Sequence, residues 1–157
     1  MSRPLILVGG GGHCKSVIEA AESAGMIIKG ILDLPSEVGK NILGYEVIGS
    51  DDDIHQYVEE YDFVVTLGFI KDPALRNRIY ARIEAAGGTL ATVIASTAHV
   101  SRHATIGAGT VVLHGAMVNA GTQIGKGCII NTLSNIEHDV IIGDYCHIST
   151  GAMVNGD

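Results

Sequence analysis

Residues 106–148, IGAGTVVLHGAMVNAGTQIGKGCIINTLSNIEHDVIIGDYCHI, place a β-branched aliphatic residue at every sixth position. A period of this kind is the signature of a solenoid, in which each repeat packs only on its neighbours. The series continues on both sides and comprises Ile94, Val100, Ile106, Val112, Val118, Ile124, Ile130, Ile136, Ile142, Ile148 and Val154.

A second series follows the first by four residues and holds nothing larger than valine. Its members are Ala98, Ala104, Thr110, Ala116, Thr122, Cys128, Ser134, Val140, Cys146 and Ala152. One large and one small inward side chain per hexad suit a narrow triangular coil, whose corners turn tightly. Three hexads make one turn, and Gly107, Gly125 and Gly143 recur at that spacing as a predicted glycine ladder. We therefore expect a parallel β-helix over residues 94–157, with Cys128 and Cys146 as packing residues.

Residues 1–93 show a different pattern, in which short apolar runs alternate with helical periodicity. Strands are expected at 4–8, 27–32 and 62–68, and helices at 13–25, 51–61 and 72–88. Ser50 and Asp53 form a capping-box pattern before the second helix. Alternating strands and helices predict a small Rossmann-like α/β domain with a parallel sheet.

A glycine run, Gly9 to Gly12, lies between the first strand and the first helix. Backbone N–H groups at such a helix start can bind a phosphate. A GxGxxG pattern begun at Gly9 fails at Cys14, so the signal for NAD is weak. Asp33 ends the second strand, where a dinucleotide-binding domain places its ribose-binding acid. The alternative interpretation is that the glycine run forms a tight turn and Asp33 is a loop residue, and that neither binds a ligand.

Composition excludes several classes of protein. The net charge is −7, with two Phe, no Trp and no basic cluster, so nucleic acid is not an expected partner. Neither a membrane span nor a signal peptide is evident, which predicts a cytoplasmic protein. The three cysteines show no CxxC spacing, so neither a disulfide framework nor a metal site is expected.

Glu137 and His138 stand side by side on the solenoid, outside both inward series. A histidine titrates near ~6.5 and can take a proton from a nucleophile, while a carboxylate beside it fixes its tautomer. Residue type alone favours the alternative interpretation, in which His138 is a solvated corner residue without a catalytic role.

A glycine-rich Rossmann-like domain followed by a hexapeptide solenoid carrying INTLSNIEHD resembles the bacterial sugar O- and N-acetyltransferases. That family includes sialic acid O-acetyltransferases and N-acetyltransferases of UDP-4-amino sugars. The resemblance implies a left-handed β-helix homotrimer, acetyl-CoA as donor, a sugar or nucleotide-sugar acceptor and no metal. It implies roles for the following residues: His138 as base with Glu137, or Asp139, beside it; Asn131, Gly9, Gly11, Gly12, His13 and Asp33 at the acceptor; His147 and Gly156 at the donor.

Two departures from the family pattern leave alternatives open. Leu34 replaces a frequent second acid after Asp33, so the nucleotide is undecided, as is the choice between amine and hydroxyl acceptors. Relatives continue for about three further turns, so the sequence predicts either a fragment or an incomplete donor site. A non-catalytic trimerising scaffold, an NAD-binding domain fused to a coil, and a metal-dependent carbonic anhydrase are the competing hypotheses.

Overall fold

The computed structural model describes residues 2–68 and 73–157. By internal contacts the chain divides into two units, residues 1–91 and 92–157. The division falls in the short link between strands β6 (Thr89–Leu90) and β7 (Val93–Ile94). The sequence pattern placed the change of architecture two residues later, after residue 93, which lies within β7.

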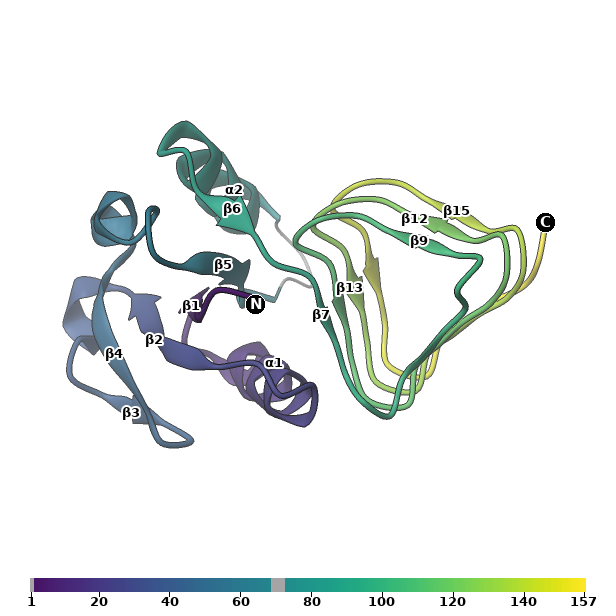
Figure 1. Cartoon of the computed structure of the whole chain (residues 1–157), viewed down its shortest axis with the longest axis horizontal. Coiled ribbons are helices and arrows are strands. Elements are labelled where there is room, and N and C mark those ends of the chain that lie inside the picture. Colours follow the sequence, from purple (N-terminus) through teal and green to yellow (C-terminus); the bar gives the residue numbers. More distant parts are fainter. Residues whose placement is uncertain (1, 69–72) are drawn as a thin grey trace. The chain divides into compact units, whose positions relative to one another are not determined.

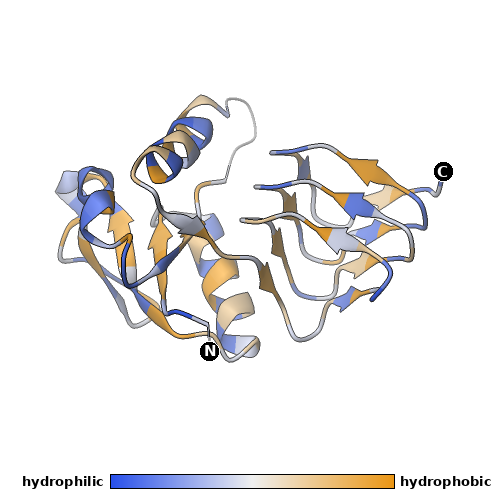
Figure 2. Ribbon diagram, turned by 45° about the horizontal axis from the view of Figure 1, so that its top comes forward, coloured by the Kyte–Doolittle hydropathy of each residue, from blue (hydrophilic) through white to orange (hydrophobic). Residues whose placement is uncertain are grey.

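The first unit contains a six-stranded sheet with the strand order β3-β4-β2-β1-β5-β6. Pairing is parallel except between β3 and β4, which form an antiparallel hairpin. The central strands are buried because most of their residues are Leu, Ile, Val or Phe, and Figure 2 shows this concentration of hydrophobic residues in the sheet. The other strands of the sheet are β1 (Leu5–Val8), β2 (Ile28–Asp33), β3 (Asn41–Ile42), β4 (Tyr45–Ser50) and β5 (Asp62–Val65).

Two α-helices connect the strands of this sheet: α1 (Gly12–Ser23) links β1 to β2, and α2 (Ala74–Ala85) links β5 to β6. The two connections run in opposite directions along the strand order, so right-handed crossovers place the helices on opposite faces. Figure 1 shows α1 and α2 on the two sides of the sheet. The predicted α/β architecture is confirmed.

Some local features differ from the expectations. In place of the helix expected at residues 51–61, the chain forms a short 3₁₀ helix, η2 (Asp51–Gln56), which has the expected capping box but buries only Ile54, too little to support a longer helix. The β3–β4 hairpin and strand β6 were not predicted. The predicted start of the third helix at Asp72 lies outside the described residues. A second 3₁₀ helix, η1, covers Pro35–Glu37.

The second unit is a coil of two-residue strands that stack into three parallel sheets, and Figure 1 shows its triangular turns. One face holds β7, β10 (Val111–Val112), β13 (Ile129–Ile130) and β16 (His147–Ile148). The next holds β8 (His99–Val100), β11 (Met117–Val118), β14 (Asn135–Ile136) and β17 (Met153–Val154). The third holds β9 (Thr105–Ile106), β12 (Gln123–Ile124) and β15 (Ile141–Ile142). The predicted β-helix is confirmed.

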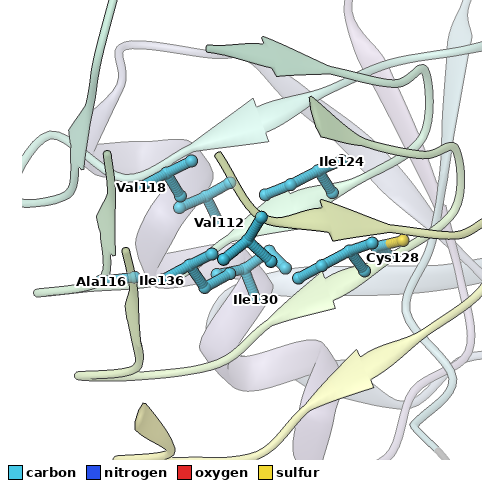
Figure 3. Packing of buried hydrophobic residues seen from close by; sticks show 9 residues of the cluster. Val112, Ala116, Val118, Ile124, Cys128, Ile130 and Ile136 are labelled. Atoms are coloured by element: carbon cyan, nitrogen blue, oxygen red, sulfur yellow. The ribbon is translucent and has the colours of Figure 1, made fainter. Parts of the chain in front are cut away.

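Both predicted inward series form the core of the coil. Figure 3 labels seven members of this buried cluster: Val112, Ala116, Val118, Ile124, Cys128, Ile130 and Ile136. The buried hydroxyls of the small series are satisfied, because Thr110 and Thr122 donate to the carbonyl oxygens of Gly125 and Glu137, each at 2.7 Å. The glycine ladder is also present, since a Cβ on Gly107 would stand 2.4 Å from the carbonyl carbon of Gly125.

Candidate active site

His138 and Asp139 lie at the corner between β14 and β15. The Nδ1 atom of His138 is 3.0 Å from Oδ2 of Asp139. Asp139 has a φ of 60°, a left-handed conformation that aspartate tolerates better than most residues. Both side chains are largely exposed, at 62% and 65%, so this pair contributes little stability. Its effect is to orient the imidazole, with Nδ1 held by the carboxylate and Nε2 turned away from it.

Gly156 lies one turn further along the same corner and packs against the imidazole of His138. A Cβ on Gly156 would stand 2.8 Å from both Cε1 and Nε2 of that ring. The backbone is held there because the N–H of Asp157 donates to the carbonyl oxygen of His138 at 3.2 Å. Within the part of the chain that the structure describes, the N–H of Gly156 has no acceptor. A backbone donor therefore stands close to the imidazole edge that carries Nε2.

Glu137, the carboxylate expected to assist His138, is engaged elsewhere. Its Oε1 accepts a hydrogen bond from Nδ2 of Asn135 at 3.0 Å. The carboxylate in contact with the imidazole is that of Asp139, which the sequence left as the second choice. Asp139 makes this contact from a left-handed backbone conformation, which the sequence did not reveal.

Asn131 and His147 form a second polar group, on the face that holds β13 and β16. Asn131 directly follows β13, and His147 is the first residue of β16. Nδ2 of Asn131 lies 3.0 Å from Nε2 of His147, and Oδ1 of Asn131 accepts from the N–H of Thr132 at 2.8 Å. An amide N–H₂ only donates, so Nε2 of His147 is the acceptor in this contact. The coil thus brings Asn131 together with His147, but it places this pair on a different part of the turn from His138.

The first unit carries a cavity of about 410 Å³ at the carboxyl ends of its strands. Strands β2 and β5 lie on either side of β1, so the cavity is at the point where the strand order reverses, the usual ligand site of open α/β sheets. Acidic and apolar side chains both line it, among them Asp33, Glu37, Asp51, Leu67 and Leu75.

The glycine loop forms one wall of this cavity. Gly9 has a φ of 119° and packs under Leu67, which a Cβ at this position would meet at 2.7 Å. The N–H of Gly10 donates to Oδ2 of Asp33 at 3.2 Å. Gly9, Gly11 and Asp33, which the sequence assigned to acceptor binding, line the cavity, whereas Gly12 and His13 are not among the described residues that form its wall.

Sequence reasoning missed several residues of this cavity, including Glu37, Asp51 and Leu67. The sequence assigned Asp51 only to the start of a helix. Asp33 ends β2 and Asp51 follows β4, and because these strands are parallel neighbours, both acids lie at the same edge of the sheet. Cys14, under the glycine loop, is fully buried, and burial raises the pKa of its thiol to about 11. It therefore remains a protonated packing residue at neutral pH.

Two further observations concern the described residues only. In residues 2–68 and 73–157, no group of three His, Cys, Asp or Glu side chains is placed to hold a metal ion. Within those same ranges, none of the helices has the length and apolar character needed to cross a membrane.

The family models and solved structures that match this chain agree with each other. Residues 4–83 match the PglD N-terminal domain, and residues 121–156 match the bacterial transferase hexapeptide (six repeats). The acetyltransferase domain of PglB from Neisseria gonorrhoeae is 33% identical, with a TM-score of 0.89, over 99% of this chain and 75% of that one. This chain belongs to the hexapeptide-repeat sugar acetyltransferase family.

Other structures of the family carry ligands. The PglB domain matches with a TM-score of 0.88 in its complex with acetyl coenzyme A. GDP-perosamine N-acetyltransferase from Caulobacter crescentus, a histidine-to-alanine variant solved with CoA and GDP-perosamine, is 30% identical with a TM-score of 0.87, over 96% of this chain and 70% of that one. The resemblance that the sequence indicated is thereby confirmed, and this acetyltransferase is an acyl-transferring enzyme.

Proposed function

We propose that this acetyltransferase moves an acetyl group from acetyl-CoA to the amine of a nucleotide-linked amino sugar, with His138 as the general base. The observation that carries the proposal is the contact set of His138, whose Nδ1 lies against Asp139 and whose Nε2 lies beside Gly156. An amine acceptor is favoured over a hydroxyl because a relative at 30% identity is a GDP-perosamine N-acetyltransferase.

His138 takes the proton that the attacking nitrogen must lose. Asp139 accepts the N–H at Nδ1, which leaves the lone pair at Nε2 available to the substrate. As the proton arrives, the imidazole becomes positively charged, and the carboxylate 3.0 Å away stabilises that charge. The same histidine can then return a proton to the leaving thiolate, so one residue acts as base and acid.

Gly156 fits the carbonyl of a thioester. Its N–H is not used by any described residue, and the space beside the imidazole would be filled by any larger side chain. A backbone donor at this place stabilises the negative charge that develops on the carbonyl oxygen during attack. Acetyl-CoA supplies the activated acetyl group. The N–H of Gly156 binds the carbonyl of that group, and His138 accepts the proton of the attacking amine.

The remaining groups are assigned to binding. The cavity of the first unit, with Asp33, Gly9 and Gly11 in its wall, is proposed to hold the nucleotide of the acceptor. A homotrimer would allow the Asn131–His147 pair of one subunit to serve a site that includes His138 of another. This division of roles assigns acceptor binding to the first unit and acetyl transfer to the second, and a cytoplasmic location is part of the proposal.

The proposal is tested by following thiol release from acetyl-CoA with amino-sugar nucleotides carrying UDP, GDP or CMP. One of these acceptors should give turnover that depends on both substrates, with the acetylated sugar identified by mass spectrometry. Thermal-shift screening selects the nucleotide first, since a ligand at about 100 times its Kd stabilises by ~2.7 kcal/mol. Turnover on the matching hydroxy sugar, but not on the amino sugar, would reject the N-acetyl assignment.

A further inference from the structure

The solenoid contains very few cations for an enzyme whose substrates are polyanions. In residues 92–157 the only Lys and Arg are Arg102 and Lys126. Lys126 lies over the ring of Tyr145, with Nζ 5.6 Å from the ring centre, at the corner between β12 and β13. Arg102 lies between β8 and β9, at the same corner of the triangle as His138. The remaining cation of the coil therefore shares a corner with the proposed base.

Arg102, Ala120, His138 and Gly156 follow each other at intervals of one turn. Backbone hydrogen bonds hold this corner in register: Gly121 N–H to His103 C=O at 3.1 Å, and Asp139 N–H to Ala120 C=O at 3.0 Å. Neighbouring strands are roughly 4.8 Å apart, so two turns separate the backbones of Arg102 and His138 by about 10 Å. An extended arginine side chain can bridge part of that separation.

The guanidinium of Arg102 is oriented but not neutralised. Its Nε donates to Nε2 of His103 at 3.2 Å, and the N–H of His103 donates to Oγ of Ser101 at 3.1 Å. Among the described residues, no carboxylate pairs with Arg102, which is exposed. Since only Nε is used, both terminal N–H₂ groups remain for an anion, and guanidinium binds phosphate through such groups.

The two sides of the imidazole differ. Gly156 occupies the side toward the C-terminus, where the thioester carbonyl is proposed to bind. This leaves the N-terminal side, along Ala120 toward Arg102, for the acceptor. We infer that Arg102, positioned by His103, binds the diphosphate that links the acceptor sugar to its nucleotide; this inference rests on the proposed function.

The chemistry of the acceptor agrees with this arrangement. In a 4-amino sugar the amine and the anomeric phosphate lie on opposite sides of the ring, so a sugar with its amine at His138 needs a phosphate site away from the base, as Arg102 is. A protein of net charge −7 repels anions overall, so local cations and backbone N–H groups must hold a bound diphosphate. Lys126 stands at a different corner of the coil and is a suitable matched control.

The experiment compares Arg102→Gln with Lys126→Gln in the full chain, in steady-state assays at low and high ionic strength. Arg102→Gln should raise KM for the nucleotide-linked amino sugar by about ten- to a hundredfold, the loss expected for a charge-assisted hydrogen bond, and leave kcat and KM for acetyl-CoA unchanged. It should also remove most of the salt dependence of that KM. Lys126→Gln should behave as wild type. An acceptor KM within about twofold of wild type, or a raised KM for acetyl-CoA instead, would overturn the inference.

Binding calorimetry separates this inference from the proposed function. Of UDP and GDP, the one that wild type binds more tightly should also bind more tightly than the corresponding nucleoside. Arg102→Gln should remove this difference in affinity and leave the affinity for the nucleoside unchanged. His103→Ala keeps the charge of Arg102 but removes the hydrogen bond to its Nε, so it should weaken binding of the diphosphate less than Arg102→Gln does. If no acceptor is turned over, the proposed function fails while this comparison still decides the role of Arg102. Failure of wild type to prefer the diphosphate would also overturn the inference.

Discussion

The imidazole of His138 is packed against the backbone of Gly156, with room for a hydrogen but not for a methyl group between them. A Cβ on Gly156 would stand 2.8 Å from Cε1 and Nε2 and 2.9 Å from the carbonyl oxygen of His138. The proposed proton acceptor and the proposed oxyanion donor are thus positioned by one contact, across adjacent turns of the coil.

Gly156→Ala should therefore lower kcat by about a hundredfold, because a displacement of around 1 Å in a catalytic group can cost that much. Gly143→Ala is the matched control, since a Cβ there meets nothing within 4 Å. Steady-state kinetics and thermal unfolding of both variants provide the measurement. Equal activity of the two variants would show that the contact between Gly156 and His138 has no catalytic role.

Asp139→Asn should reduce kcat by roughly ten- to a hundredfold, less than the ~10⁴ of a buried triad aspartate, because this pair is exposed. Glu137→Gln should cost less than Asp139→Asn, since the Glu137 carboxylate contacts Asn135 and not the imidazole. Both variants should unfold at the wild-type temperature. The reverse order of activities would assign the supporting role to Glu137.

Arg76→Ala should destabilise the first unit and weaken nucleotide binding. Arg76 is 1% exposed, and it donates to the carbonyl oxygen of Leu67 and to the hydroxyl of Tyr80, each at 3.0 Å. Losing these bonds should lower the free energy of unfolding by about 2 kcal/mol or more. Because Leu67 lines the cavity, the KM for the acceptor should also rise. Arg78→Ala, on the exposed face of the same helix, should change neither. A denaturant titration that shows equal stability for both variants would contradict this account.

Cys14 should resist thiol reagents in the folded protein. With a pKa raised by burial to about 11, the thiolate fraction at pH 8 is roughly one in a thousand, and it grows as the pH rises toward 11. Mass spectrometry after alkylation should find Cys14 unmodified at pH 8 in native protein and modified in denaturant. Rapid native labelling of Cys14 would mean that the glycine loop opens readily.

Much of the second unit was predictable because a coil repeats its geometry. Every sixth residue must point inward, so Ile124 and Ile130 were assigned to the core, and the exposure of His138 at a corner followed from the same register. The choice between Glu137 and Asp139 did not follow, because both flank the histidine. It depends on the left-handed backbone at Asp139 and on the amide of Asn135, which only the folded corner reveals.

The cavity of the first unit was only partly predictable. Gly9, Gly11 and Asp33 carry recognisable local signals, being a glycine run after a strand and an acid at a strand end. Leu67 and Asp51 come from separate segments that meet there because β5 pairs with β1 and β4 with β2. Strand order is a long-range property, so spacing along the chain did not reveal these residues.

The most direct test of the account is the rate of acetyl transfer by His138→Ala, measured by single-turnover kinetics with saturating acetyl-CoA and the preferred amino-sugar nucleotide. A general base contributes about 10²–10⁴-fold, so the rate should fall by that factor, with substrate affinities and thermal stability close to wild type. Because the side chain is 62% exposed, its removal should not disturb folding. A His138→Ala variant that transfers acetyl at the wild-type rate would contradict the assignment of His138 as the base.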